Sequence, residues 1–248
     1  MNTFPLPPLR AATLALALLI PAIPAQSSVV IIGTRVIYPG DAREKTVQMI
    51  NQDAFPNVIQ AWIDNDDPSS TPETANAPFL VSPAVTRIAP GSGQTLRLLY
   101  TGLPLPEDRE SLFHLNVLQI PPRDLAKAER NQMLLMQRSR LKLFYRPAAL
   151  LGGSEQLVEQ LHFSLVQASG NWRVRVDNPS GYYASFAGAM LSIGERRWRL
   201  LSSMVPPKGQ AEWAAERPSP LAPGPVQLNA LLINDYGARM EVQHVLPR

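Results

Sequence analysis

The sequence contains no cysteine among its 248 residues. Disulfide cross-links, thiol catalysis and thiolate metal sites are therefore excluded, and packing alone must stabilise the fold. Its three histidines, His114, His162 and His244, each lie alone within a strand-like pattern, where a histidine is usually structural. No Gly-x-Ser-x-Gly elbow and no phosphate-binding glycine loop occurs. The sequence predicts no cofactor, no metal site and no enzyme of a familiar class.

A strong excess of one charge is also lacking. The chain has 23 Lys and Arg against 20 Asp and Glu, a formal net charge of +3, and no run of five like charges. A nucleic-acid-binding protein would carry a basic stripe or a recognised motif, so nucleic acid is not an expected partner. Asp64, Asp66 and Asp67 form a small acidic cluster, for which we expect a solvated turn rather than a weak calcium site.

No apolar run is long enough to cross a bilayer as a helix, so no membrane span is expected. The longest N-terminal run, Ala11–Ile20, follows Arg10 and precedes small residues up to Ala25. This pattern is typical of a secretory signal peptide, which we place at residues 1–25. A membrane anchor is disfavoured because the run is short and stops at Pro21.

Apolar residues recur with a period of two, which is typical of β-strands with one buried face. In Asn171–Asn178, for example, Trp172, Val174 and Val176 alternate with polar residues. The 25 prolines fall between apolar runs and mark turns rather than long helices. This pattern predicts antiparallel β-sandwiches. The other predicted strands are Val29–Tyr38, Thr46–Asn51, Val58–Asp64, Ala84–Ile88, Gln94–Tyr100, Phe113–Ile120, Leu157–Gln167, Tyr182–Ser192, Arg197–Leu201, Val226–Asn234 and Arg239–Val245.

The chain is long enough for two domains of about 100 residues each. Gly152-Gly153-Ser154 is a linker signal between two series of strands. We therefore expect a first domain at 26–147 and a second at 148–248. The one helical pattern, Asp124–Asn131, is short and charged and predicts a loop with a single helical turn.

One predicted strand, Gln132–Tyr145, is unusually long. Met133–Met136 is apolar on both faces, and the pattern then alternates, with Arg138 and Arg140 on one face and Lys142 between two leucines. An exposed edge strand with two apolar faces invites aggregation. The strand is therefore either central in its sheet or made to pair with another chain.

Several segments, in order along the chain, resemble the periplasmic chaperones of the chaperone–usher pathway, which assemble pili and fimbriae. The resemblance covers nearly all of the first domain and, more loosely, the second. The matching segments are Thr34-Arg35-Val36-Ile37-Tyr38-Pro39, Pro78-Phe79-Leu80-Val81-Ser82-Pro83, Arg109-Glu110-Ser111-Leu112-Phe113-His114-Leu115-Asn116 with Ile120-Pro121-Pro122, Leu141-Lys142-Leu143-Phe144-Tyr145-Arg146-Pro147, and Ile233-Asn234-Asp235-Tyr236-Gly237.

The resemblance implies an all-β protein with two immunoglobulin-like domains in an L or boomerang arrangement, located in the periplasm. It implies a partner, a pilus or fimbrial subunit that lacks its last strand and accepts one from the chaperone, and a second partner, an outer-membrane usher. Met133 and Leu135 would fill the subunit's pockets with Gln137 next in phase, while Leu134 and Met136 would face the chaperone's own core. The segment before this strand is short, as in the branch whose clients are rod-like pili. Free chaperone molecules could cover the strand in a homodimer.

The resemblance also implies two charged sites. Arg35 and Lys142 match the pair of cleft residues that binds the C-terminal carboxylate of the subunit, a role that suits a guanidinium and an ammonium. Glu110, Arg146 and Asp235 match a charge cluster that fixes the angle between the domains.

Two other classes remain as alternatives. A secreted carbohydrate- or surface-binding β-sandwich would need an exposed aromatic cluster, for which Trp198 and Trp213 are the candidates; packing in a core or between the domains is expected for both. An exported β-sandwich enzyme would need a catalytic constellation, and the sequence contains none that we recognise.

Overall fold

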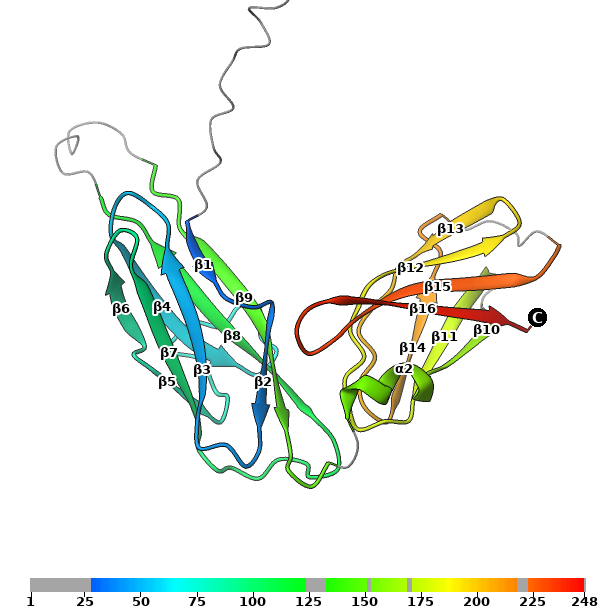
Figure 1. The fold of residues 1–248 in the computed structure, drawn as a ribbon, viewed down its shortest axis with the longest axis horizontal. Helices are drawn as coiled ribbons and strands as arrows, with labels where there is room; N and C mark the ends of the chain where they lie inside the picture. Colours follow the sequence, from blue (N-terminus) through cyan, green and yellow to red (C-terminus); the bar gives the residue numbers. More distant parts are fainter. Residues whose placement is uncertain (1–27, 124–132, 151–152, 169–170, 218–222, 248) are drawn as a thin grey trace, which may run out of the picture.

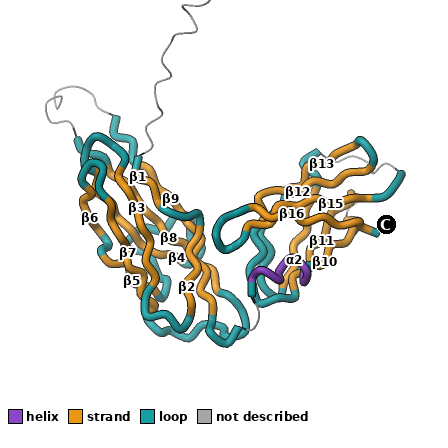
Figure 2. Tube along the Cα trace, in the orientation of Figure 1, coloured by secondary structure: helices purple, strands orange, loops and turns teal. Residues whose placement is uncertain are grey.

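The computed structural model describes residues 28–123, 133–150, 153–168, 171–217 and 223–247. The signal peptide expected at residues 1–25, the helical turn expected at Asp124–Asn131 and Gln132 lie outside these residues. Almost all regular structure is β, as predicted (Figure 2). The described strands form two lobes that meet at an angle, which confirms the expected boomerang arrangement (Figure 1).

The first lobe is a sandwich of two sheets, in the orders β1-β3-β7-β5 and β2-β9-β8-β4-β6. Inward-facing residues of both sheets form its core, among them Leu96, Leu115 and Leu143, which have no exposed surface. The strands are β1 (Val29–Ile31), β2 (Arg35–Pro39), β3 (Lys45–Asn51), β4 (Asn57–Asp64), β5 (Phe79–Ser82), β6 (Val85–Ile88), β7 (Gly93–Tyr100), β8 (Ser111–Ile120) and β9 (Gln137–Arg146).

The second lobe is also a sandwich, with sheets in the orders β10-β11-β14 and β13-β12-β15-β16. Its core contains the fully buried Trp213, and Trp198 is 9% exposed. Both tryptophans therefore pack inside, as expected. The elements are η2 (Ser154–Gln156), α2 (Leu157–Gln160), β10 (His162–Ala168), β11 (Asn171–Asn178), β12 (Phe186–Ile193), β13 (Arg196–Leu200), β14 (Gly209–Ala214), β15 (Val226–Ile233) and β16 (Arg239–Leu246).

Two strand predictions are wrong in an informative way. The run Val29–Tyr38 divides at Gly33, whose φ of +101° redirects the chain so that β1 pairs with β3 and β2 pairs with β9 in the other sheet. The run Leu157–Gln167 begins as a helical turn instead of a strand. Leu157 begins this turn and Leu161 follows it with an extended backbone, and both are buried in the core.

Candidate functional site

Strand β9 has a free edge over half of its length. It pairs with β8 from Gln137 to Tyr145, whereas β2 covers its other side only from Lys142 to Arg146. Among the described residues, no strand pairs with that other side between Gln137 and Leu141. The backbone groups along this stretch can therefore accept a further strand.

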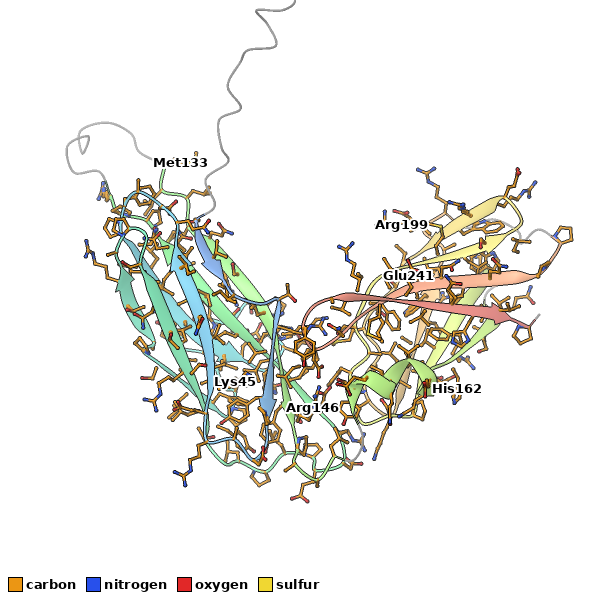
Figure 3. All side chains as sticks on the ribbon, viewed as in Figure 1. Lys45, Met133, Arg146, His162, Arg199 and Glu241 are labelled. Carbon is orange, nitrogen blue, oxygen red and sulfur yellow. The ribbon has the colours of Figure 1, made fainter. Side chains whose placement is uncertain are left out.

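The apolar run before β9 is exposed. Met133, Leu134, Leu135 and Met136 are 94%, 45%, 80% and 53% exposed. The strand predicted at Gln132–Tyr145 therefore begins only at Gln137, because its pairing with β8 ends there and Met133–Met136 belong to no strand. The expectation that Leu134 and Met136 face the core is also wrong, since both are about half exposed. Four consecutive exposed apolar side chains are typical of an interaction site. Met133 lies at the end of the first lobe that is remote from the second (Figure 3).

Arg35 and Lys142 are brought together by the parallel pairing of β2 and β9, in which they are direct partners. Arg35 donates a hydrogen bond from Nη1 to the Ile233 carbonyl at 3.1 Å, and its guanidinium lies 5.7 Å from the centre of the Phe144 ring. Its Nε is buried without a hydrogen-bond partner. The Nζ of Lys142 lies 3.4 Å from Met204 Sδ. Both contacts to Ile233 and Met204 reach into the second lobe.

The two cations have no carboxylate in direct contact within the described part of the chain. Among the described residues, neither forms an ion pair with a carboxylate. Burial lowers the pKa of Arg35, against the opposing influence of Asp235 and Glu110. Burial and then the charge of Arg35 lower the pKa of Lys142. Two adjacent, half-buried cations repel each other, so a bound anion would stabilise both.

Arg146 lies where the two lobes join (Figure 3) and forms ion pairs there with Glu110 and Asp235. Arg146 donates to Glu110 Oε1 at 2.9 Å and makes a forked contact to Asp235 at 2.8 and 3.0 Å. Burial raises the pKa of Glu110. Burial alone would raise the pKa of Asp235, but hydrogen bonds from Arg146 and Ser154 outweigh it and lower that pKa. Paired and hydrogen-bonded, the cluster connects the residue before β8, the end of β9 and the turn after β15.

Sequence reasoning missed two partners of this junction. Tyr183 donates its backbone N–H to Glu110 Oε2 at 2.8 Å. The turn after β15 packs on the first lobe, and a Cβ on Gly237 would overlap Thr34 Oγ1. A glycine in the turn Asn234–Gly237, with φ of +84°, was the available signal for a close approach.

The acidic cluster is not the solvated turn that we expected. Asp66 and Asp67 are exposed, but Asp64 is completely buried and accepts hydrogen bonds from Arg140, Asn116 and Ser70. Among the described residues, no group of His, Cys, Asp and Glu side chains could hold a metal ion.

The histidines lie in three different environments. His114 is buried, with Nδ1 3.5 Å from Asp66 Oδ1, while the ring of His244 lies 4.9 Å from that of Phe163. His162 begins β10.

No described helix is long and apolar enough to span a membrane.

Two immunoglobulin-like sandwiches, a strand with a free edge that follows an exposed apolar run, and a pair of adjacent cations are features expected of a protein that binds another polypeptide. Residues 28–151 match the family model of the pili and flagellar-assembly chaperone, PapD N-terminal domain, and residues 156–244 match that of the pili assembly chaperone PapD, C-terminal domain. The chain therefore belongs to the pili assembly chaperone family, as its motifs indicated. This is a family of periplasmic chaperones and not of enzymes.

Individual relatives cover most of the chain. Chaperone protein HifB of Haemophilus influenzae is 39% identical over 224 residues, which are 89% of this chain and 88% of HifB. The crystal structure of the Pseudomonas aeruginosa CupB2 chaperone has a TM-score of 0.74 and 35% identity, and covers 88% of this chain and all of CupB2. A structure of the Salmonella enterica SafA pilin in complex with the SafB chaperone matches with a TM-score of 0.73 and 26% identity, over 91% of this chain and 99% of the other.

Proposed function

We propose that this chain is a periplasmic chaperone that binds, caps and stabilises pilus or fimbrial subunits by donor-strand complementation, and delivers them to an outer-membrane usher. The observation that carries the proposal is the free edge of β9 with the exposed run Met133–Met136 before it. The complex of SafB with a pilin supports a subunit as the client. The apolar N-terminal run supports export through a signal peptide.

Strand addition explains both the free edge of β9 and the exposed apolar run before it. Main-chain hydrogen bonds along Gln137–Leu141 supply affinity to any extended client segment, and alternate side chains supply specificity. Met133 and Leu135 fill apolar pockets of the subunit, and Gln137 occupies the next position in phase. A glutamine there favours a client pocket with a polar group, because a buried amide without a partner is costly.

Arg35 and Lys142 hold the C-terminal carboxylate of the subunit. The contact sets the register of the added strand, since a slip by one residue would exchange the two faces. Glu110, Arg146 and Asp235 fix the angle between the lobes, and thereby the width of the cleft in which the subunit lies. In the absence of a client, a second chaperone molecule covers the exposed run Met133–Met136.

Affinity purification from the periplasm of the host tests this proposal. The tagged wild type co-purifies with fimbrial subunits identified by mass spectrometry. Arg35→Ala and Lys142→Ala lose the subunits but remain folded by circular dichroism. The matched control Arg175→Ala removes an exposed ion pair with Glu212 on the second lobe and retains them. Equal subunit recovery with Arg35→Ala, Lys142→Ala and wild type would exclude the anchor; a wild type that recovers no subunit would exclude the function.

A further inference from the structure

A buried polar network covers the outer face of the sheet that contains the donor strand. Its centre is Asp64, the last residue of β4, which has no exposed surface. Four donors reach its carboxylate: Arg140 Nη2 at 2.7 Å, Asn116 Nδ2 at 2.6 Å, Ser70 Oγ at 3.0 Å and the backbone N–H of Asp67 at 3.0 Å. One carboxylate thus connects β4, β8, β9 and the loop that follows β4.

Arg138 adds a second connection two residues away. It donates to Asn116 Oδ1 at 3.0 and 2.7 Å and to the Pro68 carbonyl at 3.0 Å. Its guanidinium also lies 4.8 Å from the ring of Trp62, whose Nε1 donates to Ser70 Oγ. Arg138 is only partly buried, yet every partner named here belongs to β4, β8 or the loop between Asp64 and Ser70.

The two arginines of the network lie on the part of β9 that has a free edge. Arg138 and Arg140 both belong to Gln137–Leu141, the stretch of β9 that has β8 on one side and a free edge on the other. A strand with only one neighbour frays easily, because half of its backbone groups face water. Here two alternate side chains hold the stretch down across β8.

We infer that Asp64 is a positioning residue for strand donation: with Arg140, Arg138 and Asn116 it holds the free edge of β9 extended and in register before a subunit arrives. This inference rests on the proposed function. Pre-ordering a binding segment strengthens binding, because the ordering entropy is lost before association. The network also fixes which face of β9 turns away from the core, and so which residues remain available to the client.

Hydrogen exchange and subunit capture test the inference together. In Asp64→Asn the carboxylate charge that Arg140 pairs with is lost, and we expect amide exchange in the free chaperone to rise at residues 137–141 more than in β3 or in the second lobe. The capture probe is the subunit that co-purifies with the wild type, refolded by dilution from denaturant in the presence of chaperone. We expect its affinity to fall about tenfold, which corresponds to about 1.4 kcal/mol.

Two further variants complete the design. Arg138→Gln retains the ion pair between Arg140 and Asp64 and loses the forked contact to Asn116. It therefore tests the inference even if Asp64→Asn does not fold. We expect the same local rise in amide exchange and a smaller loss of affinity for the subunit. Arg175→Gln, on the second lobe, changes neither. Wild-type affinity in both network variants would overturn the inference, and so would exchange that rises equally throughout the first lobe. Failure of Arg35→Ala to release the subunit would instead overturn the anchor, so the two failures are distinguishable.

Discussion

Arg35 lies directly opposite Lys142 in the parallel pairing of β2 and β9, and among the described residues no carboxylate forms an ion pair with either. Two half-buried cations side by side destabilise the free protein and stabilise a complex that brings an anion between them. If the two residues bind a carboxylate as proposed, binding is favoured at the expense of the stability of the free protein.

The first prediction concerns that trade-off. Lys142→Met removes one of the two mutually repelling cations, so we expect the free energy of unfolding to stay level or rise by up to about 1 kcal/mol while subunit capture is lost. Urea denaturation and co-purification measure the two quantities. Lys45→Met, an exposed lysine on β3, serves as the control and changes neither. A clear loss of stability in Lys142→Met would show that Lys142 is a structural residue.

The second prediction concerns the junction of the lobes. Arg146→Ala leaves Glu110, which is 4% exposed, without its cation, and we expect it to lower the free energy of unfolding by about 3 kcal/mol. Small-angle scattering should show a wider spread of angles between the lobes. Asp108→Asn is the control because it breaks an exposed ion pair between the lobes, Lys208 with Asp108, and should alter neither reading measurably. Equal effects of the two variants would contradict the role of the cluster.

The third prediction is a pH dependence that depends on His114. Burial has the largest effect and lowers the pKa of His114. The charges of Arg140 and Lys142 lower this pKa further, whereas those of Asp66 and Asp64 oppose the shift. The unfolded histidine, with a pKa near 6.5, therefore binds a proton at a higher pH than the folded one. Stability should fall as the pH drops below about 6.5 and level off below the folded pKa.

Urea denaturation between pH 5 and pH 8 checks that pH dependence. His114→Gln should lose the part of the slope that lies below about pH 6.5. His244→Gln, at an exposed position, should keep it. If His114→Gln and wild type gave parallel curves, the buried imidazole would not be the titrating group.

The fourth prediction separates backbone strain from contact. Gly237 and Gly91 both have a positive φ, of +84° and +66°, but only Gly237 lies against another residue, Thr34. Gly91→Ala should cost only the left-handed conformation, about 1–2 kcal/mol. Gly237→Ala should cost more, and it should also weaken subunit capture because Thr34 precedes Arg35, which we propose binds the carboxylate of the subunit. Thermal unfolding and co-purification provide the comparison; equal losses of stability would contradict the contact.

Strands with strict alternation could be predicted from the sequence because the buried face is recorded locally. Asn171–Asn178 is the best case, since β11 has these same bounds. The division of Val29–Tyr38 could not be predicted, because its two halves pair with strands from distant parts of the chain. The burial of Asp64 was missed for a similar reason. Its partners, Asn116 and Arg140, come from β8 and β9, so the local pattern of a polar loop was misleading.

In the candidate site, too, some features could be predicted from the sequence and others depend on distant parts of the chain. Arg35, Lys142, Glu110, Arg146 and Asp235 were singled out through family motifs, and the structure brings Arg35 to Lys142 and Arg146 to Glu110 and Asp235. The apolar run Met133–Met136 left two interpretations open, a central strand or a strand that pairs with another chain. Its exposure depends on β8 ending before it, which no property of the run itself records.

The most direct test of strand donation uses the absence of cysteine. Leu135→Cys introduces the only thiol in the chain, at a position that is 80% exposed. Its rate of labelling by a water-soluble maleimide is measured with and without the purified subunit. A separate variant, Met190→Cys, places a thiol on the second lobe as the control. If β9 and the run before it are donated to the subunit, the subunit strongly slows labelling at residue 135 and leaves the labelling rate at residue 190 unchanged. Unchanged labelling at residue 135 in a complex that contains the subunit would contradict strand donation.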